Sequence, residues 1–101
     1  MSECQHHIYQ LQPTRTAMVT EGPDEHEGPI LAAHYDYLMA LGASGKLSLV
    51  GRTANNDENT FGLVVINSGD NTEAREIMEN DPAVKNEIMN AQLYPFSKAF
   101  P

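Results

Sequence analysis

The stretch LAAHYDYLMAL, residues 31–41, carries a histidine within a run that has the apolar spacing of a helix. In a helix, His34 shares its face with apolar and aromatic residues: Ile30, Tyr37, Leu38 and Leu41. An imidazole on a buried face needs a hydrogen-bond partner, and imidazole is also a common group for general acid/base catalysis. His34 is therefore either a core histidine bonded to a backbone carbonyl or a functional residue whose partner lies elsewhere in the chain.

The aspartate of the NDP motif, Asp81, is a second residue to which chemistry can be assigned. Pro82 follows it at a position that the first turn of a helix tolerates, and Val84 and Ile88 then share one face. The sequence thus predicts a short helix that Asp81 caps. Capping alone would account for this aspartate, so a capping role and a catalytic role both remain open.

Two arginines, Arg15 in QPTR and Arg52 in GRT, each follow a predicted strand in a chain that has three arginines. A guanidinium offers a planar fork of donors that suits a carboxylate or a phenolate. The alternative is a salt bridge to nearby carboxylates such as Asp57 and Glu58. Both arginines are candidates for substrate binding.

The remaining histidines give little reason to expect a metal. His6 and His7 would point to opposite faces of a strand, and His26 completes no known ligand spacing. The chain has no glycine-rich phosphate loop and no G-x-S-x-G motif. We therefore expect neither a metal nor another cofactor.

Composition limits the class of protein. A chain of 101 residues with 41% hydrophobic residues predicts one compact domain over residues 1–101. Its net charge of -8 disfavours nucleic acid and anionic membranes as partners. The single cysteine, Cys4, cannot form an internal disulfide, which favours a reducing compartment. With no apolar signal core and no apolar run of membrane-spanning length, we expect a cytoplasmic protein.

The N-terminal half predicts a strand followed by a helix. Apolar residues from Ile8 to Met18 and Val19 indicate one strand, interrupted or ended near Pro13. Asp24 and Glu27 have the spacing of a capping box, which marks the start of a helix. We expect the regular helix to run from Pro29 to about Ser44, with Gly45 as its stop.

The C-terminal half predicts two strands, two helices and a last strand. Residues 46–52 and 60–67 read as an antiparallel hairpin whose second strand is apolar on both faces. Asp70 and Glu73 form another capping box, before a helix with an apolar stripe: Ala74, Ile77 and Met78. After the short helix at Asp81, residues 91–100 predict an edge strand, because Pro95 suits an edge.

This order of elements matches a ferredoxin-like split βαβ fold of the α+β class, an antiparallel sheet with the helices on one face. The other face would then expose the apolar side chains of residues 60–67, which predicts a homodimer, or a higher homo-oligomer, packed through the sheets.

The chain also resembles a known family of small proteins, the YciI-like (YCII-related) family, from about Ile8 to Phe100. The elements that carry the resemblance are LQPTR through TEGP, the H-x-x-YL of His34, Tyr37 and Leu38, then GK-L---GRT, DENTFG and IMENDPAVK. Their order and spacing together are more specific than any one of them. The resemblance implies the dimeric α+β barrel arrangement, in which two sheets pack face to face.

The resemblance also implies a site. The family is associated with a histidine and aspartate pair, which falls here on His34 and Asp81, with Asp81 orienting the imidazole and His34 moving a proton. With Arg15 and Arg52, Tyr37 completes the expected substrate-binding set. The family includes a dehydrochlorinase of a hydroxylated chloroaromatic, so elimination or isomerisation of a small organic, possibly aromatic, compound is the activity implied. The alternative is a non-catalytic module that binds a small ligand or acts as an accessory subunit.

Overall fold

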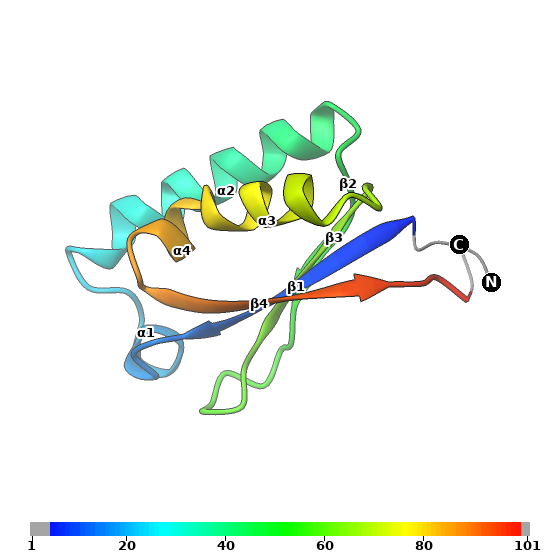
Figure 1. The fold of residues 1–101 in the computed structure, drawn as a ribbon. Helices are drawn as coiled ribbons and strands as arrows, with labels where there is room; N and C mark the ends of the chain where they lie inside the picture. Colours follow the sequence, from blue (N-terminus) through cyan, green and yellow to red (C-terminus); the bar gives the residue numbers. More distant parts are fainter. Residues whose placement is uncertain (1–4, 100–101) are drawn as a thin grey trace.

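The structure, a computed structural model, describes residues 5–99 (Figure 1). Its elements in chain order are β1 (His6–Pro13), α1 (Ala17–Thr20), α2 (Glu27–Ala43), β2 (Leu47–Arg52), β3 (Gly62–Ile66), α3 (Asn71–Glu79), α4 (Pro82–Lys85) and β4 (Met89–Phe96). The four strands form one sheet in the order β2-β3-β1-β4, and every neighbouring pair is antiparallel.

The helices α2 and α3 lie over one face of this sheet, and the other face is left open (Figure 1). The architecture is the ferredoxin-like α+β fold expected from the order of elements. The hairpin of β2 and β3 is confirmed, and β4, which contains Pro95, is an edge strand as predicted.

The core lies between the covered face of the sheet and the two long helices. Its buried members are Tyr9, Leu11, Leu38, Val64, Ile66, Ala74, Ile77 and Met78. The predicted apolar stripe of α3 is therefore buried, and Leu38 on the predicted inner face of α2 is almost fully enclosed. Burial of one such leucine side chain contributes about 2 kcal/mol to folding.

The prediction of a strand at Met18 and Val19 is wrong, because these residues form the short helix α1. The strand β1 ends at Pro13, which cannot donate a ladder hydrogen bond. The backbone of Met18 then bonds back to the carbonyl of Arg15, and its side chain packs against Ala83 and Ile88. The apolar side chain of Met18 is therefore explained by its burial against Ala83 and Ile88, and not by membership of a strand.

The first long helix begins two residues before the predicted start at Pro29. Asp24 Oδ1 accepts a hydrogen bond from the backbone N–H of Glu27 at 2.8 Å, and Glu27 Oε1 accepts one from the N–H of Asp24 at 2.9 Å. This is the reciprocal capping box predicted from the spacing. Pro29 lies within the first turn, where a backbone N–H has no partner inside the helix, so the proline costs no hydrogen bond there.

The helix ends at Ala43, close to the predicted end at Ser44, and the predicted stop Gly45 follows with a φ of 81°, a left-handed conformation that favours glycine. The second capping box forms only in part. Asp70 caps α3 by accepting from the N–H of Thr72, whereas Glu73 turns away to Lys46 at 3.0 Å. Hydrogen bonds from Ser68 and Lys46 lower the pKa of Glu73.

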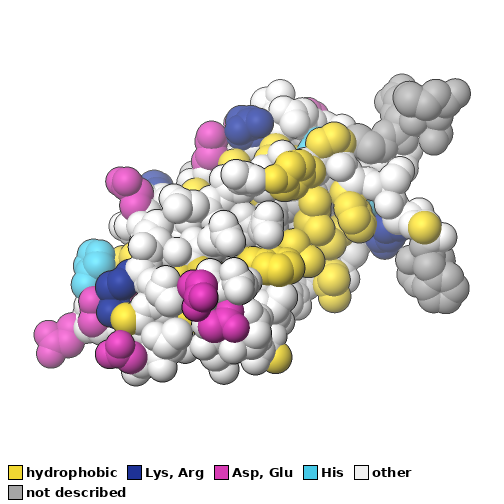
Figure 2. Space-filling view, turned by 90° about the horizontal axis from the view of Figure 1, so that it is seen from below, with side chains coloured by type: hydrophobic (Ala, Val, Ile, Leu, Met, Phe, Trp, Pro, Cys, Tyr) yellow, Lys and Arg dark blue, Asp and Glu magenta, His cyan; other side chains and the backbone are white. Residues whose placement is uncertain are grey.

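The open face of the sheet carries a row of apolar side chains that crosses all four strands. Register pairs Leu49 with Val65, Val65 with Ile8, and Ile8 with Tyr94. Figure 2 shows this face as a band of hydrophobic side chains running across the molecule. Among the helices of residues 5–99, none combines the length and the hydropathy of a membrane span.

Candidate active site

The structure brings His34 and Asp81, which are distant in sequence, into direct contact. His34 lies in the middle of α2, and Asp81 immediately precedes α4. His34 Nδ1 and Asp81 Oδ1 are 2.6 Å apart. Both side chains are enclosed, with exposed fractions of 6% for His34 and 0% for Asp81. Packing of α4 against α2 brings His34 and Asp81 together.

Asp81 serves as a helix cap and as the histidine partner at once. Its Oδ1 accepts from the backbone N–H of Ala83 at 3.0 Å as well as from His34. Its Oδ2 accepts from the hydroxyl of Tyr9 at 2.8 Å. Three donors from three elements hold this carboxylate in place, so the two roles considered from the sequence are compatible.

Tyr9 is the member of this network that the sequence did not single out. Burial and the neighbouring Asp81 carboxylate raise the pKa of Tyr9 well above its ordinary value, so its phenol stays protonated and donates. The sequence did contain a weak indication of this role. Alternation along β1 places Tyr9 on the same face as His7 and Leu11, and a buried tyrosine hydroxyl needs a hydrogen-bond acceptor.

The Asp81 carboxylate determines which nitrogen of His34 carries the hydrogen. A carboxylate only accepts hydrogen bonds, so Nδ1 donates and holds the proton in the neutral ring. The lone pair then belongs to Nε2, which faces away from Asp81. This is the arrangement in which an imidazole can accept a proton from a bound compound.

A cavity of about 290 Å³ lies next to His34, between α2 and the inner face of the sheet. Its walls are mainly apolar, with Leu31 and Leu38 from α2, Val64 from β3 and Met89 from β4. A predominantly apolar pocket with a few polar groups is typical of a small-molecule site, and this volume is at the lower end of the usual range. The space suits a compound of roughly one ring.

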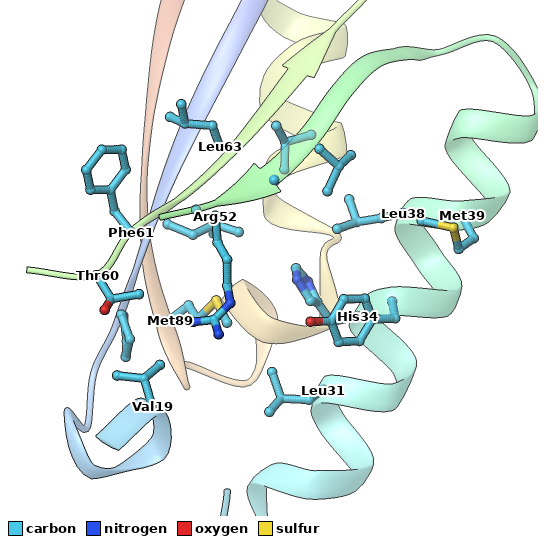
Figure 3. Close-up of a pocket in the computed structure, with 17 residues that line it drawn as sticks. Val19, Leu31, His34, Leu38, Met39, Arg52, Thr60, Phe61, Leu63 and Met89 are labelled. Atoms are coloured by element: carbon cyan, nitrogen blue, oxygen red, sulfur yellow. The ribbon is translucent and has the colours of Figure 1, made fainter. Parts of the chain in front are cut away.

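Arg52 lies at this pocket, as expected for a substrate-binding residue. Figure 3 shows its side chain reaching from the end of β2 into the space that His34 faces from α2. Within residues 5–99 its guanidinium makes no ion pair, and the alternative of a salt bridge to Asp57 or Glu58 is absent there. Arg52 therefore presents a free cation to the cavity.

Arg15 is placed differently from the expectation. Its Nε donates to Glu27 Oε2 at 2.9 Å and its guanidinium lies 3.7 Å from Asp24, and it is not part of the pocket wall. The hydrogen bond from Arg15 lowers the pKa of the buried Glu27 to about 2. Arg15 therefore joins the segment after β1 to the start of α2. It forms a salt bridge, which was the alternative to substrate binding.

Tyr37 is also outside the wall of the cavity. Its hydroxyl donates to the carbonyl of Ile77 at 2.7 Å and so joins α2 to α3. Burial, with a smaller contribution from Asp81, raises the pKa of Tyr37 to about 12. Of the three residues expected to bind substrate, only Arg52 lines the pocket, because Arg15 and Tyr37 have partners elsewhere.

The other histidines stand apart from this site. His7 is buried, and its ring Nδ1 bonds the backbone carbonyl of Ser68 at 2.8 Å. His26 is exposed at the start of α2. The part of the chain that the structure describes contains no cluster of three or more His, Cys, Asp or Glu side chains that could hold a metal ion. Cys4 lies outside the described residues.

The fold and the pocket define a class: a small ferredoxin-like α+β protein with a histidine and aspartate pair beside an apolar cavity. Residues 10–97 match the family described as the YCII-related domain. Because this match covers most of the chain, the protein belongs to the YCII-related family. The family resemblance noted in the sequence is confirmed.

One solved structure with a similar fold is 5-chloro-2-hydroxyhydroquinone dehydrochlorinase (TftG) from Burkholderia phenoliruptrix AC1100, in complex with 2,5-dihydroxybenzoquinone. The TM-score is 0.65, and the similarity covers 92% of this chain and 95% of that one. The sequences are 18% identical, so this similarity shows the fold. Comparison with curated proteins yields no significant match.

Proposed function

We propose that this protein is a small enzyme in which His34 transfers a proton to or from a small organic compound held in the cavity. The observation that carries the proposal is the 2.6 Å contact between His34 Nδ1 and Asp81 Oδ1 at the wall of an apolar pocket. Asp81 holds the ring in one tautomer and leaves Nε2 as the base. A base positioned in this way accelerates proton transfer roughly 100- to 10,000-fold.

The chemistry that fits is isomerisation or elimination. In an isomerisation, Nε2 takes a proton from one carbon of the substrate and the imidazolium returns it to another. In an elimination, the electron pair of the broken C–H bond forms a C=C bond, and the leaving group departs with its own electron pair. In both cases the Asp81 carboxylate offsets the positive charge that forms on His34.

The similarity to a dehydrochlorinase supports this class of reaction. That enzyme is described in complex with 2,5-dihydroxybenzoquinone, a small hydroxylated ring compound. The cavity of about 290 Å³ in this chain suits a ligand of that size. We therefore place hydroxylated aromatic and quinone compounds first among the substrates to be tested.

The test is exchange of substrate C–H hydrogens for deuterium in D₂O, followed by proton NMR across a panel of hydroxylated aromatics and quinones that carry at most one ionised hydroxyl. We expect the wild type to catalyse exchange in at least one compound, and His34→Asn to slow it roughly 100-fold or more. His26→Asn is the matched control, because His26 is exposed and outside the pocket. Compounds that bind but keep all their hydrogens would contradict catalysis and support the non-catalytic binding module.

We further propose that two copies pack through the open faces of their sheets. The apolar row of Leu49, Val65, Ile8 and Tyr94 supports this arrangement, because its two ends, Leu49 at 57% and Tyr94 at 44% exposed, would otherwise contact water. The cavity wall comes mainly from α2 and the covered face, with Gly51 and Leu63 from the open face.

A further inference from the structure

The cavity wall carries a positively charged side chain, although the chain as a whole is acidic. Fourteen acidic residues face six basic ones in the sequence. Arg52 is nevertheless the one Lys, Arg, Asp or Glu among the residues that line the described cavity. An acidic protein that places an arginine in an otherwise apolar pocket provides a local attraction for anions.

The sheet leaves room for Arg52 to act there. Across the covered face, Arg52 pairs with Gly62, Gly62 with Leu11, and Leu11 with Ala91. Arg52, Gly62 and Leu11 of this row all line the cavity, and Gly62 contributes no side chain to it. A Cβ added at Gly62 would lie 3.5 Å from the carbonyl oxygen of Gly51 and 3.7 Å from Leu11 Cβ, in ordinary van der Waals contact.

Among the residues that the structure describes, the guanidinium of Arg52 has no partner side chain, in contrast to two other cations of the chain, Arg15 and Lys46. Arg15 is bonded to Glu27 and Lys46 to Glu73. Arg52 makes no ion pair or side-chain hydrogen bond within residues 5–99. Its planar fork of donors therefore remains available for two oxygens or for one charged oxygen of a ligand.

We infer that the cavity selects small organic monoanions, carboxylates or ionised phenols and enols, and that Arg52 binds their charged oxygen. The inference rests on the proposed function for the ligand's position beside His34. The hydrocarbon part of the ligand lies against Leu31 and Met89, and the hydrogen to be removed faces His34 Nε2. As the proton leaves, the negative charge that develops on the ligand oxygen is stabilised by Arg52.

A single guanidinium also sets an upper limit on ligand charge. The remainder of the cavity wall is apolar or neutral, and the chain as a whole carries a net charge of -8. A second negative charge would have no cation to pair with and would be repelled by the protein. Inorganic phosphate, which is largely doubly charged at pH 8, is therefore excluded.

The experiment compares benzoate with benzamide, which have the same shape but differ in charge, by NMR titration of the wild type at pH 8. We expect benzoate to bind about ten times more tightly, and Arg52→Gln to abolish that preference. Inorganic phosphate should not displace benzoate. Arg75→Gln is the matched control, because Arg75 is exposed on α3 and does not line the cavity.

The outcomes separate this inference from the proposed function. Equal binding of the two probes, or a benzoate preference that survives Arg52→Gln, would overturn the role of Arg52 and leave proton transfer by His34 intact. A wild type that prefers benzoate but exchanges no hydrogen in any compound would support Arg52 and contradict catalysis. If neither probe shifts the resonances of cavity residues, both the anion site and the small-molecule pocket are wrong.

Discussion

The two faces of the sheet differ in what their neighbouring rows of side chains can do. On the covered face, Tyr9 lies between Val64 and Leu93 and donates to Asp81 beneath the helices. On the open face, the adjacent row is apolar across all four strands, and Leu49 at its end is 57% exposed. One face holds a buried polar network, whereas the other carries an apolar row beside the paired Gln10 and Gln92.

This difference shows where each kind of function can arise. A histidine and a carboxylate keep one geometry when buried donors from several elements fix them, which the covered face provides through Tyr9 and Ala83. The open face has no comparable set of polar partners. Its apolar row is suited to packing against a second apolar surface, which requires shape and area but no specific chemistry.

The largest effect is expected from breaking the polar network of the covered face. Asp81→Ala removes a helix cap and leaves two buried donors, the Tyr9 hydroxyl and His34 Nδ1, without an acceptor. We expect the free energy of unfolding to fall by about 3–5 kcal/mol, measured by urea denaturation. Asp70→Ala, which removes the cap of α3 alone, should cost about 1 kcal/mol. Equal losses in the two variants would show that the network adds nothing beyond capping.

A charge on the open face should change assembly while leaving the fold intact. Leu49→Asp places a carboxylate in the apolar row, and we expect the dimer dissociation constant to rise on the order of 100-fold. Met39→Asp is the control, because Met39 is 61% exposed but lies on α2 at the covered side. Sedimentation equilibrium measures both. A wild type that is monomeric at micromolar concentrations would contradict packing through this face.

The smallest effect concerns an ion pair that belongs to neither face. Glu27 has its pKa lowered to about 2 by the hydrogen bond from Arg15, against an ordinary value of 4.5. A carboxyl whose folded pKa is depressed stabilises the fold above its unfolded pKa and loses that contribution as pH falls. Urea denaturation should show decreasing stability from pH 4.5 to pH 2, and Glu27→Gln should flatten this decrease. An unchanged slope in the variant would assign the acid sensitivity to other carboxyls.

The parts of this protein that were predictable from the sequence depend on local spacing. The reciprocal capping box of Asp24 and Glu27, the left-handed glycine at Gly45 and the inward face around His34 each involve residues within a few positions of one another. Hydrogen bonds and side-chain directions at that range follow from helix and strand geometry alone. They can therefore be inferred before any tertiary contact is known.

The errors have the opposite character. Met18 and Val19 have the composition of a strand, but Met18 packs against Ala83 and Ile88 and Val19 lines the cavity. Arg15 and Arg52 occupy similar places after a strand, yet one is bonded to Glu27 and the other is free at the cavity. The alternative considered for His34, a core histidine bonded to a backbone carbonyl, describes His7 and its contact with Ser68 instead, for which no such prediction was made. Sequence spacing does not distinguish Arg15 from Arg52, or His7 from His34.

The sequence by itself determined the order of the four strands and of the helices α2, α3 and α4, though not α1, and the inward position of His34. These depend on periodicity and on turn and cap residues that act over a few positions. Only the tertiary structure decided that Asp81 and Tyr9 meet at that histidine, and that Arg52 rather than Arg15 faces the same cavity. Such contacts depend on how the helices pack on the sheet. That packing results from many long-range contacts at once, and local spacing carries no information about which distant side chains will meet.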